Sequence, residues 1–186
     1  MNALDPAVVA IVKATAPRLA RQGSAIVARM YERLFAADPE FKALFNPAHM
    51  TLDRQIGALA EALVAYAQNL DRIERFAGSL ERIAQKHVAL SIRPDQYPVI
   101  GKHLLAALQE SFGKAATPQV MSAWAMAYGY LADLFIGREK ELYASRLEEP
   151  GGWVGLREFR VAKRSRSARP RAIFSCLKIS PAPSCS

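Results

Sequence analysis

Cysteine is almost absent from this chain of 186 residues, and its two copies, Cys176 and Cys185, lie near the C-terminus. Residues 1–153 therefore form no disulfide among themselves and no zinc site with cysteine ligands. They also lack the Cys-x-x-Cys-His motif through which haem is attached covalently. Any cofactor in this part of the chain must be held by other side chains.

Long apolar runs are missing as well. The most apolar stretch, residues 120–136, is interrupted by Ser122 and Asp133, so we expect a core helix and no membrane span. The first six residues show no basic region followed by an apolar run. We therefore expect no secretion signal and a cytoplasmic protein.

Charge of one sign is confined to the end of the chain. The formal net charge is +8, but residues 154–186 hold eight Lys or Arg and one acid (+7), whereas residues 1–153 hold 17 basic and 16 acidic residues (+1). The basic run from Lys163 to Arg171 has no interleaved aromatic residues. We interpret it as a solubilising tail and expect no nucleic-acid binding.

Segments with the alternating pattern of half-buried strands are absent before residue 150. Apolar residues recur instead every three or four positions, and Asp5-Pro6, Asp38-Pro39 and Thr117-Pro118 are typical of helix starts. Ser24, Thr51 and Asp71 are further N-cap candidates. We predict an all-α domain over residues 1–150 with about seven helices, at 6–22, 25–37, 39–45, 52–69, 72–90, 94–113 and 118–147.

One histidine occupies a position where an apolar side chain is expected. His87 shares a helix face with Leu80, Ile83 and Ala84, because these residues are spaced by three and four. A neutral imidazole in such a place is either hydrogen-bonded within a core or bound to a metal. Taken in isolation, the core histidine is the commoner of the two.

Other polar and aromatic side chains also interrupt apolar helix faces. Tyr31 would ordinarily be a core tyrosine whose hydroxyl reaches the rim, and Phe45 would ordinarily plug a core. Gln55 is costly on an apolar face unless it finds a partner or a ligand, the alternative being exposure at a helix start. Glu141 continues an apolar stripe near a helix end, where a solvated acid is equally expected. Tyr97 stands at a helix start, where an exposed tyrosine is unremarkable.

Together these residues belong to six motifs whose order and spacing resemble one family, the globin domain of bacterial flavohaemoglobins and of related single-domain bacterial haemoglobins. The resemblance runs from about Asp5 to about Val161 and implies a globin fold that encloses a haem. The motifs are Arg29-Met-Tyr31-Glu-Arg-Leu-Phe35, Phe41-Lys-Ala-Leu-Phe45-Asn, Ile83-Ala-Gln-Lys-His87, Gln96-Tyr97-Pro-Val-Ile-Gly101, Ala123-Trp124 with Ala127-Tyr128-Gly129, and Arg138-Glu-Lys-Glu141-Leu-Tyr143.

The resemblance implies a ligand and a distal partner for the iron. His87 would be the proximal ligand of a b-type haem. Tyr97 and Glu141 would form the network that orients its other ring nitrogen and pushes electron density toward the iron. On the distal side Tyr31 would donate a hydrogen bond to bound O2, with Gln55 as a second polar group.

The remaining implied contacts are with the haem itself. Phe45 would pack on the haem plane and Leu59 would form part of the apolar distal wall. Lys86 suits a haem propionate or a contact with a reductase, the alternative being a solvated helix lysine. Two histidines stay outside the expected site: His49 does not match the distal position, and His103 is expected at the surface.

The resemblance ends in the linker. Gly151-Gly152-Trp153 and Arg157-x-Phe159-Arg160 look like the junction where the family's flavin domain begins. Neither an Arg-x-Tyr-Ser flavin motif nor a Gly-rich dinucleotide loop follows them. We expect residues 151–186 to be a linker and basic tail resembling the truncated start of a reductase domain. FAD and NAD(P)H would then enter only through a separate reductase.

Three functions remain open at this point. The first is nitric oxide dioxygenase chemistry, in which O2 and NO give nitrate with electrons from an external reductase. The second is O2 storage or delivery without significant turnover. The third is a haem-free globin fold that serves as an interaction module.

Overall fold

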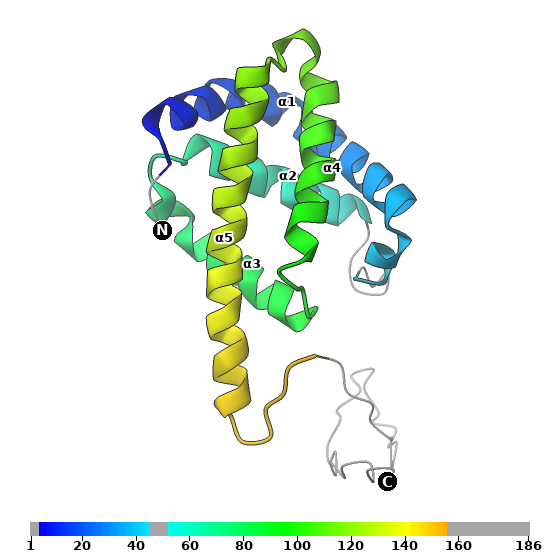
Figure 1. Ribbon diagram of the computed structural model, residues 1–186, viewed down its shortest axis with the longest axis vertical. Coiled ribbons are helices and arrows are strands. Elements are labelled where there is room, and N and C mark those ends of the chain that lie inside the picture. The colour runs from blue at the N-terminus through cyan, green and yellow to red at the C-terminus, as the bar shows by residue number, and fades with distance from the viewer. Residues whose placement is uncertain (1–3, 45–51, 156–186) are drawn as a thin grey trace, which may run out of the picture. The chain divides into compact units, whose positions relative to one another are not determined.

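The computed structural model describes residues 4–44 and 52–155 (Figure 1). Within these ranges all regular secondary structure is helical, which confirms the predicted all-α class, and none of the helices is both long and apolar enough to cross a membrane. By its internal contacts the chain divides after Val154. The helices are α1 (Pro6–Ala37), η1 (Pro39–Leu44), α2 (Leu52–Gln68), η2 (Ile73–Phe76), α3 (Ala77–Ala89), α4 (Gln96–Phe112), η3 (Gly113–Ala115) and α5 (Pro118–Glu148), where η marks a 3₁₀ helix.

Two helices begin where a capping residue precedes proline, as predicted. The Asp5 carboxylate accepts a hydrogen bond from the N–H of Ala7 at 2.7 Å. The Thr117 hydroxyl accepts one from the N–H of Val120 at 3.3 Å. Each cap satisfies an N–H that has no partner within the helix, and the proline that follows has no N–H to satisfy.

The prediction of separate helices over 6–22 and 25–37 is wrong, because α1 continues through Gly23 and Ser24. A Cβ placed on Gly23 would lie 3.3 Å from the Cβ of Ala60 on α2. The glycine therefore allows α1 and α2 to approach closely and does not break the helix. Ser24 lies inside α1 and does not act as an N-cap.

Other predicted boundaries shift because short 3₁₀ turns replace α-helix. The segment 39–45 forms η1 as far as Leu44, and the predicted helix 72–90 is η2 followed by α3. Asp71 is no cap; its carboxylate pairs with Lys13 at 2.8 Å. The described residues thus hold five α-helices where about seven helices were predicted. The predicted linker and tail, residues 151–186, lie almost entirely outside the described residues.

Helix α1 is the centre of the packing. It contacts α2, α4 and α5, and α3 packs on α5; in Figure 1, α1 and α2 pass behind α4 and α5. Two buried side chains with polar groups, Trp124 of α5 and Tyr66 of α2, form hydrogen bonds between helices. The Trp124 indole N–H donates to the Thr15 hydroxyl at 3.0 Å, and the Tyr66 hydroxyl donates to the carbonyl of Ala127 at 2.7 Å. Their polar groups are therefore satisfied inside the core.

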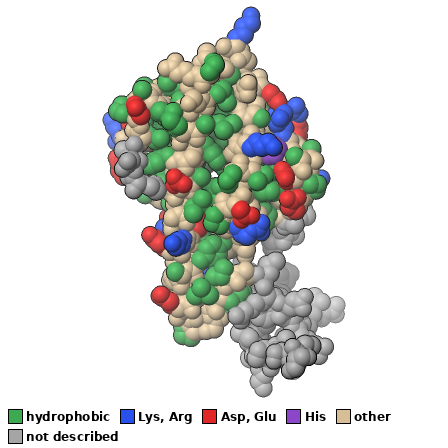
Figure 2. Space-filling view, viewed as in Figure 1, with side chains coloured by type: hydrophobic (Ala, Val, Ile, Leu, Met, Phe, Trp, Pro, Cys, Tyr) green, Lys and Arg blue, Asp and Glu red, His purple; other side chains and the backbone are tan. Residues whose placement is uncertain are grey.

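Acidic and basic side chains are interspersed over the face shown in Figure 2. This distribution agrees with the near balance of charge in residues 1–153. The surface ion pairs include Arg29 with Glu110 at 2.8 Å, across α1 and α4. Since exposed pairs contribute only about 0–1 kcal/mol each, the stability of the fold rests on the apolar core.

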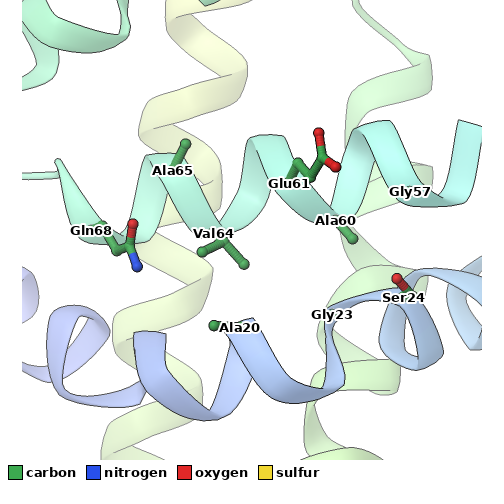
Figure 3. A pocket seen from close by; sticks show the side chains of 9 residues that line it. All are labelled: Ala20, Gly23, Ser24, Gly57, Ala60, Glu61, Val64, Ala65 and Gln68. Carbon is green, nitrogen blue, oxygen red and sulfur yellow. The ribbon is translucent and has the colours of Figure 1, made fainter.

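A pocket of about 330 Å³ lies between α1 and α2 (Figure 3). Gly57 borders it, and a Cβ added there would meet no atom within 4 Å. We expect Gly57→Ala to raise the free energy of unfolding by about 1 kcal/mol, because alanine is favoured over glycine inside a helix. Chemical denaturation measures this change. Gly23→Ala is the control: with Ala60 at 3.3 Å it should gain less, and a larger gain at Gly23 would contradict the packing described.

Candidate functional site

His87 of α3 belongs to a hydrogen-bond network with α4 and α5. Its Nδ1 lies 2.7 Å from Oε1 of Glu139 and 2.9 Å from the hydroxyl oxygen of Tyr97. The Tyr97 hydroxyl donates to the same carboxylate oxygen at 2.5 Å. Glu139 and Tyr97 are only 2% and 6% exposed, so the carboxylate is held by partners that exclude water.

This network decides which nitrogen of His87 carries the proton. A carboxylate only accepts hydrogen bonds, and the Tyr97 hydroxyl already donates its one proton to Glu139, so Nδ1 of His87 carries the proton that Glu139 accepts. In the neutral ring Nε2 then holds the lone pair. Within the described ranges nothing hydrogen-bonds to Nε2, and the side chain is 28% exposed. An oriented imidazole with an accessible lone pair suits a metal ligand.

Tyr97 is buried, so the alternative of an exposed tyrosine at a helix start does not apply. Burial raises the pKa of Tyr97, and its hydrogen bond with Glu139 raises it further. The phenol thus stays protonated at neutral pH and keeps its bond to the carboxylate. The Phe135 ring packs against both neighbours, with its centroid 5.3 Å from that of His87 and 6.4 Å from that of Tyr97.

Glu141, the predicted partner of Tyr97, does not reach this network. Its side chain is 68% exposed and accepts a hydrogen bond from Nη1 of Arg138 at 2.6 Å. Because successive helix residues are rotated by 100°, Glu139 points to nearly the opposite side of α5 and contacts His87. A four-residue spacing would have found the correct carboxylate, since every fourth position is buried: Ala127, Leu131, Phe135 and Glu139.

His103 also differs from its expected place at the surface. It is buried on α4, and its Nε2 lies 3.2 Å from the Asp38 carboxylate that follows α1. It is buried because this face of α4 packs on α1. None of its hydrogen bonds among the described residues links it to His87. Two residues discussed in the sequence analysis, Phe45 and His49, lie outside the described residues.

Tyrosines of α5 brace the turn between His87 and Tyr97. The Tyr128 hydroxyl donates to the carbonyl of Tyr97 at 2.7 Å, and the Tyr143 hydroxyl donates to the carbonyl of Ile92 at 2.9 Å. Within the turn, the N–H of Ile92 donates to the His87 carbonyl at 2.9 Å. These bonds anchor the backbone on either side of the network to the same helix that carries Glu139.

Gly101 leaves the space that the Tyr128 ring fills. A Cβ added to Gly101 would overlap this ring. We expect Gly101→Ala to lower the free energy of unfolding by about 1–3 kcal/mol, because the ring must shift and its bond to Tyr97 is strained. Thermal or urea unfolding measures the loss. Gly129→Ala is the control, since its Cβ would meet nothing within 4 Å; an equal loss in both variants would contradict this account.

A second polar pair joins α1 and α2. The Tyr31 side chain is buried, and burial raises its pKa to about 12, while a hydrogen bond with the Gln55 side chain acts in the opposite direction. The Tyr31 ring stacks on Phe35 with centroids 5.5 Å apart. At neutral pH the phenol is therefore protonated and able to donate. Leu59 follows Gln55 by one turn of α2 and is partly buried.

Gln55 and His87 stand on helices α2 and α3, which both carry partly buried apolar side chains. Helix α2 packs on α1 and α3 packs on α5, but α2 and α3 are not among the helix pairs with extensive packing in the described part of the chain. Both carry apolar side chains that are only partly buried: Ile56 and Leu59 on α2, and Leu80 and Ile83 on α3. These faces suit an apolar ligand.

The donor set limits the kind of metal that fits. Among the described residues no group of three or more His, Cys, Asp or Glu side chains gathers as a metal site requires. A metal whose other ligands come from a prosthetic group, as in haem, needs only one histidine nitrogen, which Nε2 of His87 can supply. His87, held by Glu139 and Tyr97, fits a haem. Lys86 lies exposed on α3, next to His87 in the sequence.

Comparison with known proteins agrees with this geometry. A profile of the globin family matches residues 28–134, more than half of the chain. The flavohemoprotein of Rhizobium meliloti is 50% identical over 155 residues, which cover 83% of this chain and 38% of the relative. That of Bordetella pertussis is 46% identical over 162 residues, covering 87% and 40%. The chain spans about two fifths of the length of these relatives.

Solved structures show the same likeness. A bacterial globin from Campylobacter jejuni superimposes with a TM-score of 0.68 at 30% identity, covering 74% of this chain and 97% of the other. The flavohemoglobin of Malassezia yamatoensis, solved with bound FAD and heme, gives a TM-score of 0.70 at 31% identity, covering 77% and 38%. An engineered carbene transferase from Rhodothermus marinus, described as a "putative nitric oxide dioxygenase", gives 0.74 at 32% identity, covering 78% and 99%. The helical fold, the matched profile and these relatives together show that the chain belongs to the globin family.

Proposed function

We propose that this globin binds haem b through Nε2 of His87 and supports nitric oxide dioxygenase chemistry with electrons from a separate reductase. The observation that carries the proposal is the bond between Nδ1 of His87 and Glu139, 2.7 Å long, which leaves Nε2 as the lone-pair nitrogen. The names of the relatives support it, since they include flavohemoproteins and a nitric oxide dioxygenase. When bound, haem iron supplies the site where O2 and NO combine to nitrate.

On the proximal side, His87 would hold the iron and Glu139 would hold His87. The buried carboxylate keeps the imidazole in one tautomer and one orientation. Its negative charge would make the ring a stronger electron donor to the iron. Tyr97 shares the carboxylate oxygen at 2.5 Å and so restrains Glu139 from the other side. Glu139 would thus take the part that the resemblance implied for Glu141.

On the distal side, Tyr31 and Gln55 would act on the ligand. The protonated Tyr31 hydroxyl is a hydrogen-bond donor in a buried site, where such a bond is strong. Gln55 contacts Tyr31 and can either orient its hydroxyl or donate from its own amide. Leu59 would form part of the apolar distal wall, and Phe45 would pack on the haem plane.

The supply of electrons completes the proposal. Conversion of NO and O2 to nitrate takes one electron per turnover, which a separate reductase carrying FAD and using NAD(P)H would deliver. Lys86, exposed on α3, would contact a haem propionate or this reductase. The same haem-binding residues without a reductase would serve O2 storage or delivery, which is the alternative function.

Reconstitution with haem tests the proposal. We expect the wild-type chain to give a Soret band, to bind O2 when reduced, and to convert NO to nitrate when a flavin reductase and NADH are supplied. A missing Soret band would overturn both haem functions and favour the interaction module. Reversible O2 binding without nitrate formation under these conditions would leave O2 storage or delivery as the function.

Tyr31→Phe tests the distal donor. We expect this variant to release O2 about 5–30 times faster than the wild type, because it loses one buried hydrogen bond worth about 1–2 kcal/mol. Stopped-flow measurement of O2 dissociation from the haem-loaded protein gives the rate. Tyr130→Phe is the matched control on α5 and should leave the rate unchanged. Equal rates for Tyr31→Phe and the wild type would show that Tyr31 does not contact the ligand.

A further inference from the structure

A second pair of side chains joins the two helices that carry His87 and Glu139. Arg138 of α5 uses two nitrogens to bind the carboxylate of Glu81 on α3, with Nε at 2.6 Å from Oε2 and Nη2 at 3.2 Å from Oε1. We call this two-point contact the Arg138–Glu81 bridge. Its geometry matches the flat guanidinium to the flat carboxylate, and this fixes both the separation and the relative orientation of the two groups.

The bridge joins residues that are close in sequence to Glu139 and His87. Arg138 directly precedes Glu139, and Glu81 lies on α3 less than two turns before His87. Near the end of α3 a further bond joins the same two helices, from Nη1 of Arg146 to the carbonyl of Val88 at 3.4 Å. The bond between His87 and Glu139 is therefore flanked along α3 by two other contacts with α5.

We propose that Arg138 is a positioning residue, whose bridge to Glu81 holds α5 against α3 so that Glu139 meets Nδ1 of His87. The side chains of Arg138 and Glu81 are 36% and 41% exposed, so the pair adds little to global stability. Its effect is local, because a displacement of α5 by a fraction of an ångström would lengthen the buried bond at Glu139.

Arg138 has another acidic partner that provides a matched control. Its Nη1 binds Glu141 at 2.6 Å, but both residues lie on α5, so this contact joins no second helix. Glu81→Gln and Glu141→Gln each remove one negative charge from the same guanidinium. Only Glu81→Gln removes the charge that ties α5 to α3, so the two variants separate positioning from a general charge effect.

The experiment uses four proteins: the wild type, Arg138→Met, Glu81→Gln and Glu141→Gln. In the haem-free full chain, NMR measures how fast the Nδ1 proton of His87 exchanges with water, which reports the openness of its bond to Glu139. In the reduced haem-loaded chain, resonance Raman measures the iron–histidine stretching frequency. The second readout rests on the proposed function, whereas the first does not.

We expect the exchange to be about two- to fivefold faster in Arg138→Met and Glu81→Gln, with a lower stretching frequency, and both readouts unchanged in Glu141→Gln. Wild-type values in both bridge variants would overturn the proposal, as would the same change in all three variants. Should Arg138→Met fail to fold, Glu81→Gln, which retains the arginine, decides the question. If the wild type takes up no haem, the proposed function fails, and the haem-free exchange rates still decide the bridge.

Discussion

His87→Gly is expected to lower the affinity of the protein for haem by about 100-fold or more. Substitutions behind a metal ligand already cost about 10–100-fold, and this one removes the ligand itself. The glycine leaves a cavity beside Glu139 that free imidazole fills with the same nitrogen geometry. Titration of the apoprotein with haem, followed at the Soret band, measures the affinity with and without imidazole.

The second histidine provides the control for this experiment. His103 is equally able to bind a metal in principle, but its hydrogen bond is with Asp38 and joins α4 to the end of α1. His103→Gln should therefore keep wild-type haem affinity. Wild-type affinity in His87→Gly, or a matching loss in His103→Gln, would overturn the assignment of His87 as the ligand.

Glu139→Gln is expected to lower the rate of NO consumption about 10–100-fold and to lower the iron–histidine stretching frequency, with haem still bound. The amide has nearly the shape of the carboxylate but no negative charge, so the imidazole becomes a weaker donor. The Tyr97 hydroxyl keeps an acceptor in the amide oxygen, which limits damage to the fold.

Glu141→Gln distinguishes the two acidic residues of this segment. Its carboxylate is exposed and bound to Arg138, so its removal should change neither the stretching frequency nor the rate of NO consumption. An effect at Glu141 without one at Glu139 would restore the prediction made from sequence and contradict the geometry of α5. Nitrate formation and Raman spectra of the two variants, recorded in parallel, settle which carboxylate acts on His87.

Local signals in the sequence predicted much of the fold. Asp5 before Pro6 and Thr117 before Pro118 cap helices where predicted, because a capping bond involves only residues close in sequence. The same local reasoning failed at Gly23. Glycine is a helix breaker in an isolated peptide, but here α2 packs on that position and α1 continues through it.

The candidate site, like the fold, was predicted from the sequence only in part. His87 stood out because its face is apolar and its neighbours match a family motif, so the sequence alone determined the all-helical class and the residue of greatest interest. Which carboxylate reaches His87 depends on the rotation of α5 against α3. Between these two helices Phe135 packs on His87 and Arg138 binds Glu81.

Tertiary structure alone therefore decided between Glu139 and Glu141, and it buried Tyr97 and His103. In each case the deciding partner is distant in sequence: Glu139 of α5 for Tyr97, and Asp38, which follows α1, for His103. Periodicity along one helix states which residues share a face, whereas burial depends on what that face meets. The sequence determined the class of fold and singled out His87, and the packing of α3, α4 and α5 determined how that histidine is held.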